Sequence, residues 1–166
     1  CLNNHRQLCR AWLMYASDNN ERLATSWFGE GGQPQPRWAG GWLGWTTSPD
    51  NTNTILLTDP RYSSLAQYCG KDARLFKCPA DQYLSSAQRA FGYKERVRSI
   101  AQNPYAANGN VEIGPSDPAY AHITKLTELL NPKPAETWVS MDEHPDSIND
   151  GSLIPPSMSW IDVPAN

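Results

Sequence analysis

Apolar residues recur at spacings of three and four near the start of the chain, a period that predicts an amphipathic helix over residues 2–19. Polar residues such as Arg6 and Arg10 fall mostly outside the apolar stripe. Asp18 and the two asparagines after it predict the end of the helix, because such side chains compete for backbone hydrogen bonds. The stripe consists of Leu8, Trp12, Tyr15 and Ala16, with Leu2, Cys9 and Leu13 beside it.

Start and stop signals predict two further helices. Asp59 and Pro60 are typical of the first residues of a helix, and Gly70 is typical of the residue that ends one. We therefore expect a second helix between Asp59 and Gly70. Thr124 predicts the cap of a short third helix, which ends before Pro132.

Short runs of strand-favouring residues predict a small sheet late in the chain. Residues 136–141 are rich in residues that favour strands, and residues 96–102 alternate polar and apolar side chains. An extended segment is expected at 74–79, a short strand near 41–46, and a final hairpin over 153–160. Together these elements predict an α+β fold, in which an N-terminal helix packs on a small antiparallel sheet with long ordered loops.

Composition narrows the class of protein. The chain has 166 residues, the size of one domain, and we expect a single domain over 1–166. The formal net charge is −3 and no run of Lys and Arg occurs, which argues against nucleic acid as a partner, because phosphate binding needs a basic patch. No run of 18 apolar residues predicts a membrane-spanning helix within the chain. Because the helical pattern already runs at Cys1, we expect a longer polypeptide on that side.

Four cysteines form an even set, at Cys1, Cys9, Cys69 and Cys78. Four cysteines allow three pairings, which their spacing leaves open. Zinc is not favoured by the sequence, because no C-x2-C pair is present. Disulfides are the preferred interpretation over buried free thiols, and they would indicate an oxidising, extracytoplasmic compartment.

An acidic turn follows the strand predicted at 136–141. Five oxygen-bearing side chains fall within nine positions, and calcium is bound by six to eight oxygens, often from one loop. The turn therefore predicts a calcium site, with an ordinary Asp/Asn turn as the alternative. The candidate ligands are Asp142, Glu143, Asp146, Asn149 and Asp150.

Tryptophans are concentrated in the Gly- and Pro-rich segment 24–54. Exposed indole rings stack on sugar faces, so Trp27, Trp38, Trp42 and Trp45 suggest a secreted glycan-binding module as an alternative function. The favoured interpretation is that these large rings pack the long loop onto the body of the domain.

The sequence contains no organised catalytic motif, and no enzymatic activity is expected. Asp142 and Glu143 are adjacent, so on a strand they point to opposite faces and do not suit paired acid and base chemistry. His5, His122 and His144 are isolated, without the spacing of a metal-binding helix.

Four stretches of the chain resemble, in the same order, the type IV pilin-like pseudopilins that carry a prepilin cleavage and methylation signal. This family is plentiful in planctomycete-type and verrucomicrobial bacteria. The opening, 1–20, is similar to the segment that follows the membrane helix in these proteins, and 76–81 resembles their Cys-Pro-Ala-Asp turn. Residues 96–103 resemble their Arg-Ser strand segment, and 141–151 are similar to their acidic Asp-Glu-His turn.

The resemblance implies a pilin-like head domain, whose first helix continues a membrane and assembly helix that lies before Cys1. It implies a non-catalytic structural subunit of a type II secretion-type or type IV pilus-like filament. Sibling pseudopilins, in a homo-oligomeric filament, and an inner-membrane assembly platform would be its partners. The head would be extracytoplasmic, in the periplasm or at the cell surface, and membrane-anchored in the full-length protein. A further strand would follow Asn166, and calcium binding in a C-terminal loop occurs in major pseudopilins of this kind.

The resemblance also implies a disulfide scheme. Cys1 and Cys78 stand where the family often has Cys, whereas Cys9, which replaces a usual Gly, and Cys69 are unusual. The implied pairs are Cys1–Cys78 and Cys9–Cys69, and the local pair Cys69–Cys78 is the alternative. His5 stands where the family commonly has Leu, which weakens the match of the helix face.

Overall fold

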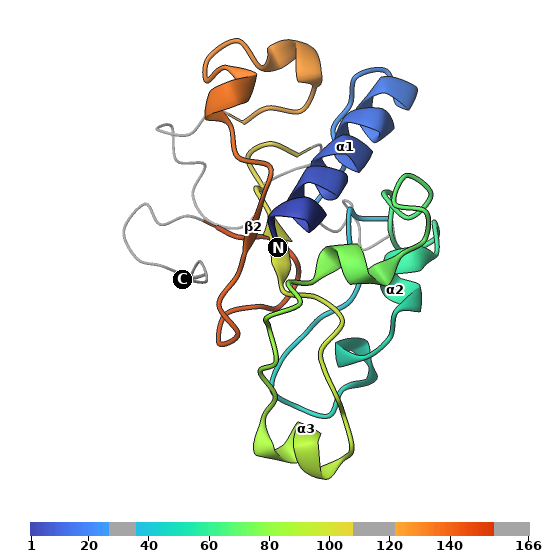
Figure 1. Cartoon of the computed structure of the whole chain (residues 1–166). Coiled ribbons are helices and arrows are strands. Elements are labelled where there is room, and N and C mark those ends of the chain that lie inside the picture. Colours follow the sequence, from blue (N-terminus) through green and yellow to red (C-terminus); the bar gives the residue numbers. More distant parts are fainter. Residues whose placement is uncertain (27–35, 108–121, 155–166) are drawn as a thin grey trace.

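One long helix, α1 (Leu2–Asp18), lies along a body of turns, short helices and a small sheet in this computed structural model (Figure 1). The structure describes residues 1–26, 36–107 and 122–154. α1 confirms the helix predicted over 2–19. Among the residues described, no helix combines the length and the apolar character needed to cross a bilayer.

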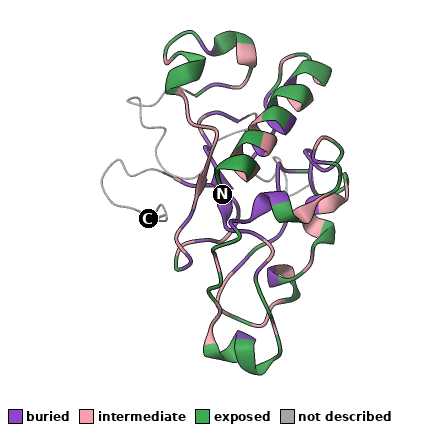
Figure 2. Cartoon of the chain, viewed as in Figure 1, coloured by how far each residue is buried: buried purple, intermediate pink, exposed green. Residues whose placement is uncertain are grey.

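The buried face of α1 follows the predicted apolar stripe. Leu8, Ala11, Trp12 and Ala16 are buried at spacings of three and four, where they join the core of the body. The helix ends at Asn19, whose side chain donates a 2.7 Å hydrogen bond to the carbonyl of Tyr15. The face turned away from the body is largely exposed (Figure 2).

Two three-residue strands form the antiparallel sheet. β1 (Ile100–Gln102) pairs with β2 (Ser140–Asp142), with Ile100 opposite Asp142 and Gln102 opposite Ser140. On its other side β1 is bonded to a returning segment, because the Gln102 amide donates to the carbonyl of Gly151 at 2.8 Å. An α+β fold with an N-terminal helix and a small antiparallel sheet is therefore confirmed.

Both strands are shorter than predicted. The predicted strand 96–102 begins only at Ile100, because the preceding amides bond elsewhere: that of Val97 to the carbonyl of Asn51, and that of Ser99 to the carbonyl of Phe76. The predicted strand 136–141 starts late, because a 3-10 turn, η5 (Pro134–Glu136), occupies its beginning.

The helix expected between Asp59 and Gly70 is wrong. Helix α2 (Ile55–Thr58) ends where that helix should begin, and residues 59–71 form successive turns. The reason lies in tertiary hydrogen bonds: the Ser64 amide donates to the carbonyl of Arg37, and the Ser63 hydroxyl donates to the carbonyl of Trp38, both at 2.7 Å.

The remaining short elements also differ from the sequence-based expectations. The third helix is one 3-10 turn, η4 (Leu126–Glu128), and the extended segment expected at 74–79 begins with another, η3 (Ala73–Phe76). Residues 41–46 form no strand, and the hairpin over 153–160 lies largely outside the described residues. Helix α2, the 3-10 turn η2 (Pro49–Asn51) and helix α3 (Ser86–Ala90) were not predicted.

The core lies between α1, the sheet and the turns that follow α2 (Figure 2). Trp38 packs against Phe76 with 5.6 Å between the ring centroids, and both residues are almost fully buried. Around them lie Leu8, Trp12, Leu57, Leu65 and Ile100. This core fixes the positions of the three features described next: the outer face of α1, the acidic turn and the disulfide corner.

Candidate functional site

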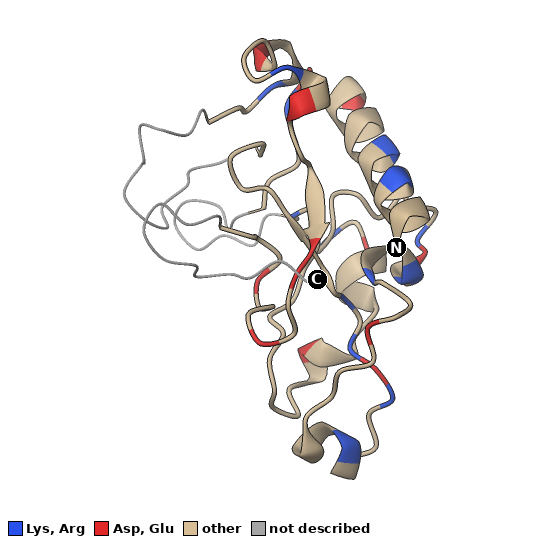
Figure 3. Ribbon diagram, turned by 60° about the vertical axis from the view of Figure 1, so that its left-hand side comes forward, with Lys and Arg blue, Asp and Glu red and all other residues tan. Residues whose placement is uncertain are grey.

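The outer face of α1 carries apolar side chains that the body does not cover. Leu2, Leu13 and Met14 are 67%, 46% and 55% exposed, and they lie beside the exposed Arg6 and Arg10. We call these five residues the outer face of α1. Figure 3 shows basic residues in blue along α1. The helix therefore has one face packed in the core and another, mixed apolar and basic face, open to solvent.

A disulfide joins Cys1, directly before α1, to Cys78. Their Cα atoms are 4.7 Å apart, and the bond closes a sequence separation of 77 residues. The Cys1–Cys78 pair is thus confirmed. The Cys9–Cys69 pair, and the alternative Cys69–Cys78, are wrong, because Cys9 and Cys69 are free thiols. Cys69 belongs to the buried core, whereas Cys9 lies at the half-buried edge of α1.

We expect the two free thiols to resist alkylation in the folded protein. Burial, with a smaller contribution from Asp72, raises the pKa of Cys69 to about 12, and burial raises the pKa of Cys9. Because only the thiolate reacts, labelling with iodoacetamide at pH 8 should be slow at Cys9 and slower still at Cys69. Intact mass after alkylation in urea without reductant should then show two labels, whereas no label would indicate a second disulfide.

The acidic turn, residues 142–151, does not bring its five candidate calcium ligands together. Asp142 Oδ2 lies 3.2 Å from His5 Nε2, and Asp146 Oδ1 accepts a 3.2 Å hydrogen bond from the indole of Trp45. Asp150 Oδ1 accepts from the Ser152 amide at 2.9 Å. Within the described part of the chain, no three of the four carboxylates come close enough to share one ion.

The other two candidate ligands, Glu143 and Asn149, interact with neighbouring residues of the chain. Glu143 is only 2% exposed. Its negative charge favours the protonated form of the buried Arg96 and Arg98, and so opposes the lowering of their pKa by burial. Asn149 Oδ1 accepts a hydrogen bond from the Asp150 amide, and its backbone carbonyl accepts from Arg98. The four carboxylates therefore do not converge on one point in this geometry, and calcium binding by the acidic turn stays a prediction.

Three buried arginines hold the acidic turn through its backbone. Arg98 donates to the carbonyl of Asn149 at 2.9 Å, Arg96 to that of Pro145 at 3.1 Å, and Arg37 to that of Asp150 at 3.3 Å. Carbonyls bonded to guanidinium groups are poor ligands for a further cation, so these three backbone oxygens do not favour calcium binding.

Burial is the main influence on these arginines. It lowers the pKa of all three, and it lowers that of Arg98 to about 10 although Glu143 and Asp150 oppose the shift. Arg98 is therefore still protonated at neutral pH. The sequence does not reveal the burial of these arginines, because the alternation of Arg96 and Arg98 with Val97 is also typical of a strand with one solvent-exposed polar face.

The tryptophans do not form a common stacking surface within the described residues. Trp38 is wrong as a ligand-stacking residue: it is 2% exposed, and its indole donates to the carbonyl of Gly151 at 3.0 Å. The guanidinium of Arg96 covers the ring of Trp45 at 4.5 Å. Trp42 is exposed, and Trp27 lies outside the described residues. Packing thus explains Trp38 and much of the environment of Trp45.

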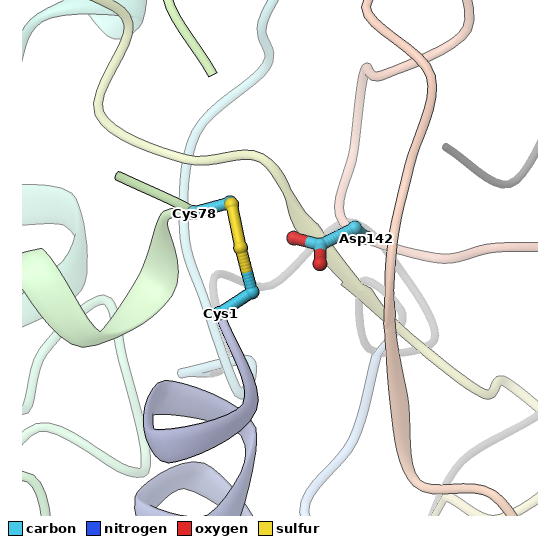
Figure 4. A group of neighbouring side chains, drawn as sticks. All are labelled: Cys1, Cys78 and Asp142. Carbon is cyan, nitrogen blue, oxygen red and sulfur yellow. A yellow bond between two sulfur atoms is a disulfide. The ribbon is translucent and has the colours of Figure 1, made fainter. Parts of the chain in front are cut away.

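The disulfide corner, defined by Cys1, Cys78, His5, Asp142 and Ser99, joins α1 to the sheet. His5 Nδ1 lies 2.9 Å from the hydroxyl of Ser140, and its Nε2 faces Asp142. The Ser99 hydroxyl accepts a 2.7 Å hydrogen bond from the Cys78 amide. Figure 4 shows the Asp142 carboxylate beside the two sulfur atoms. Sequence analysis missed this grouping, whose members are distant along the chain.

Comparison of the chain with protein-family models, with curated proteins and with solved structures finds no match. A proposal about function therefore depends on the geometry of the chain itself.

Proposed function

We propose that this chain is the head domain of a pilin-like structural subunit, which assembles into a type II secretion-type or type IV pilus-like filament. Sibling subunits and an inner-membrane assembly platform are its partners. Its role is packing rather than catalysis, in an extracytoplasmic compartment to which the disulfide is suited.

The observation that carries this proposal is the two-faced character of α1. The buried face joins the core through Leu8 and Trp12, so the helix is a fixed part of the body. The outer face leaves Leu2, Leu13 and Met14 in water. Burying such a side chain against a neighbouring subunit contributes about 1.5–3 kcal/mol. A helix with one face built into the head and an apolar second face suits lateral packing between subunits.

The start of α1 supports the same proposal. Cys1 is exposed and is tied to Cys78, which fixes the first turn of the helix to the body. His5 links that same part of the helix to β2. A helix anchored in this way transmits the orientation of an upstream helix to the head, as assembly of a regular filament requires.

We expect charge on the outer face of α1 to prevent assembly. Leu13→Glu and Met14→Glu, introduced into the complete gene product in its native host, should each lower the amount of sheared filament at least tenfold. The reason is that an interface between subunits would have to bury the new carboxylate. Electron microscopy and immunoblotting of the sheared fraction measure this effect.

A matched control is Phe91→Glu. Phe91 is 68% exposed and follows α3, at the opposite end of the body from α1 (Figure 1). This variant should assemble like the unmodified protein. Normal filaments from both α1 variants, with circular dichroism showing an intact head, would disprove the proposal, as would a complete gene product that has no apolar helix before Cys1.

A further inference from the structure

The two sulfur atoms of the disulfide corner and a carboxylate oxygen of Asp142 all lie within 4.8 Å of one another (Figure 4). We propose that, once the Cys1–Cys78 bond is reduced, Cys1, Cys78, Asp142 and His5 bind one zinc ion. The corner thus alternates between a covalent cross-link and a metal cross-link. This inference does not depend on the proposed function.

The distances suit a tetrahedral site after small movements. Zinc lies about 2.3 Å from thiolate sulfur and about 2.0–2.2 Å from nitrogen or carboxylate oxygen, so ligand atoms lie about 3.3–3.8 Å apart. The three ligand atoms are already within 4.8 Å. Asp142 is held by its pairing with Ile100, and the Cys78 amide is held by the Ser99 hydroxyl, so rotation of the side chains is the movement that closes the remaining distance.

His5 supplies the fourth ligand after a movement of its side chain, because its ring is not among the atoms that lie within 4.8 Å of one another. It lies one helical turn after Cys1, on the same side of α1, and its Nε2 is 3.2 Å from Asp142 Oδ2. The opposite ring nitrogen, Nδ1, lies 2.9 Å from the Ser140 hydroxyl. Metal-bound histidines almost always place the second nitrogen against such a partner, which fixes the tautomer and the ring orientation.

The surroundings favour a soft divalent cation. A cavity of about 300 Å³ opens beside the two cysteines and provides access for an ion. Asp81 and Glu143 also line this cavity, so the local potential attracts a cation. Two thiolates select zinc over calcium or magnesium, which prefer oxygen ligands. This chemistry differs from the calcium site expected in the acidic turn.

Conversion of the disulfide to the zinc site begins with a two-electron reduction of the Cys1–Cys78 bond. A phosphine, with one water, is oxidised to its phosphine oxide, the Cys1–Cys78 bond breaks, and each sulfur gains one electron and one proton. Zinc then displaces both thiol protons and binds the two thiolates. The resulting site carries two thiolates, one carboxylate and one neutral imidazole around one Zn²⁺.

Cobalt titration tests the site directly, because tetrahedral Co²⁺ with thiolate ligands absorbs in the visible and near ultraviolet. The 166-residue chain, reduced with a phosphine under nitrogen, should bind one equivalent of Co²⁺ with these bands. Zinc should displace the cobalt and abolish them. The oxidised chain should show no bands, and bands in the oxidised chain would disprove the proposal.

Variants identify the ligands. Cys1→Ala/Cys78→Ala should abolish the bands, whereas Asp142→Asn and His5→Ala should each weaken Co²⁺ binding at least tenfold. The matched control, Cys9→Ala/Cys69→Ala, removes the other two thiols and should bind Co²⁺ normally. Near-ultraviolet circular dichroism of the oxidised Asp142→Asn and His5→Ala proteins checks that they are folded. Unchanged binding in both of these variants, or loss of binding in the control, would overturn the assignment.

Discussion

Replacement of Arg98 by alanine is expected to lower the free energy of unfolding by about 3–5 kcal/mol. Arg98 is fully buried, and its guanidinium bonds the carbonyls of Ile100 and Asn149. The positive charge of Arg98 also compensates the negative charge of the buried Glu143. The substitution removes one of the cations near Glu143 and takes the Arg98 donor from the buried carbonyl of Ile100, and both changes destabilise the folded state. The carbonyl of Asn149 keeps the Leu43 amide as a donor, at 2.8 Å.

Urea denaturation, followed by tryptophan fluorescence, measures this loss. Arg61→Ala is the matched control, because Arg61 is exposed and contacts only neighbouring side chains on the surface, Asp59 and Tyr62 among them. This variant should leave the midpoint of the transition nearly unchanged. Arg98→Met/Glu143→Leu should lose less stability than the two single variants added together, since it removes both charges. A loss below about 1 kcal/mol for Arg98→Ala would contradict the assigned role of this residue.

Loss of the Cys1–Cys78 bond is expected to lower the free energy of unfolding by about 2–5 kcal/mol. The bond spans 77 residues, so its removal restores much conformational freedom to the unfolded chain. It also removes the covalent tie between the body and the first turn of α1, which is then held by hydrogen bonds from residues such as Asn4 and His5. Urea denaturation with and without a phosphine, in the presence of EDTA to exclude metals, measures the effect.

Two variants separate this bond from the free thiols. Cys1→Ala/Cys78→Ala should have lower stability that no longer responds to the phosphine. Cys9→Ala/Cys69→Ala should respond as strongly as the unmodified chain, because neither residue is in a disulfide. If the phosphine leaves the stability of the unmodified chain unchanged, the bond does not stabilise the fold.

Local patterns in the sequence predicted those parts of the structure that local forces determine. The spacing of Leu8, Trp12 and Ala16 predicted α1, because a long amphipathic period has few alternatives. By contrast, Asp59 and Pro60 have the chemistry of a helix start, yet the Ser64 amide soon after them bonds to the distant carbonyl of Arg37. Such contacts between distant segments override the local preference of Asp59 and Pro60 for a helix start, and no pattern in a single sequence reveals them.

The candidate sites differ in the same way. Asp142 and Glu143 are neighbours whose roles diverge, since one contacts His5 and the other lies among buried arginines. The carboxylate spacing suggested one common ion, but the path of the chain separates the oxygens. The disulfide corner shows the reverse case: spacing argued against zinc for Cys1 and Cys78, whereas folding brings Asp142 to both sulfur atoms.

Both ends of the acidic turn are fastened to β1 and its immediate flank. The Glu143 amide donates to the carbonyl of Ser99, and the Leu153 amide donates to that of Gln102, each at 2.9 Å. The turn therefore leaves β2, passes the side chain of Arg98 and returns along the other side of β1. The acidic turn cannot unfold locally, because its unfolding would break hydrogen bonds on both sides of β1. Its amides should exchange with solvent only when the whole domain opens.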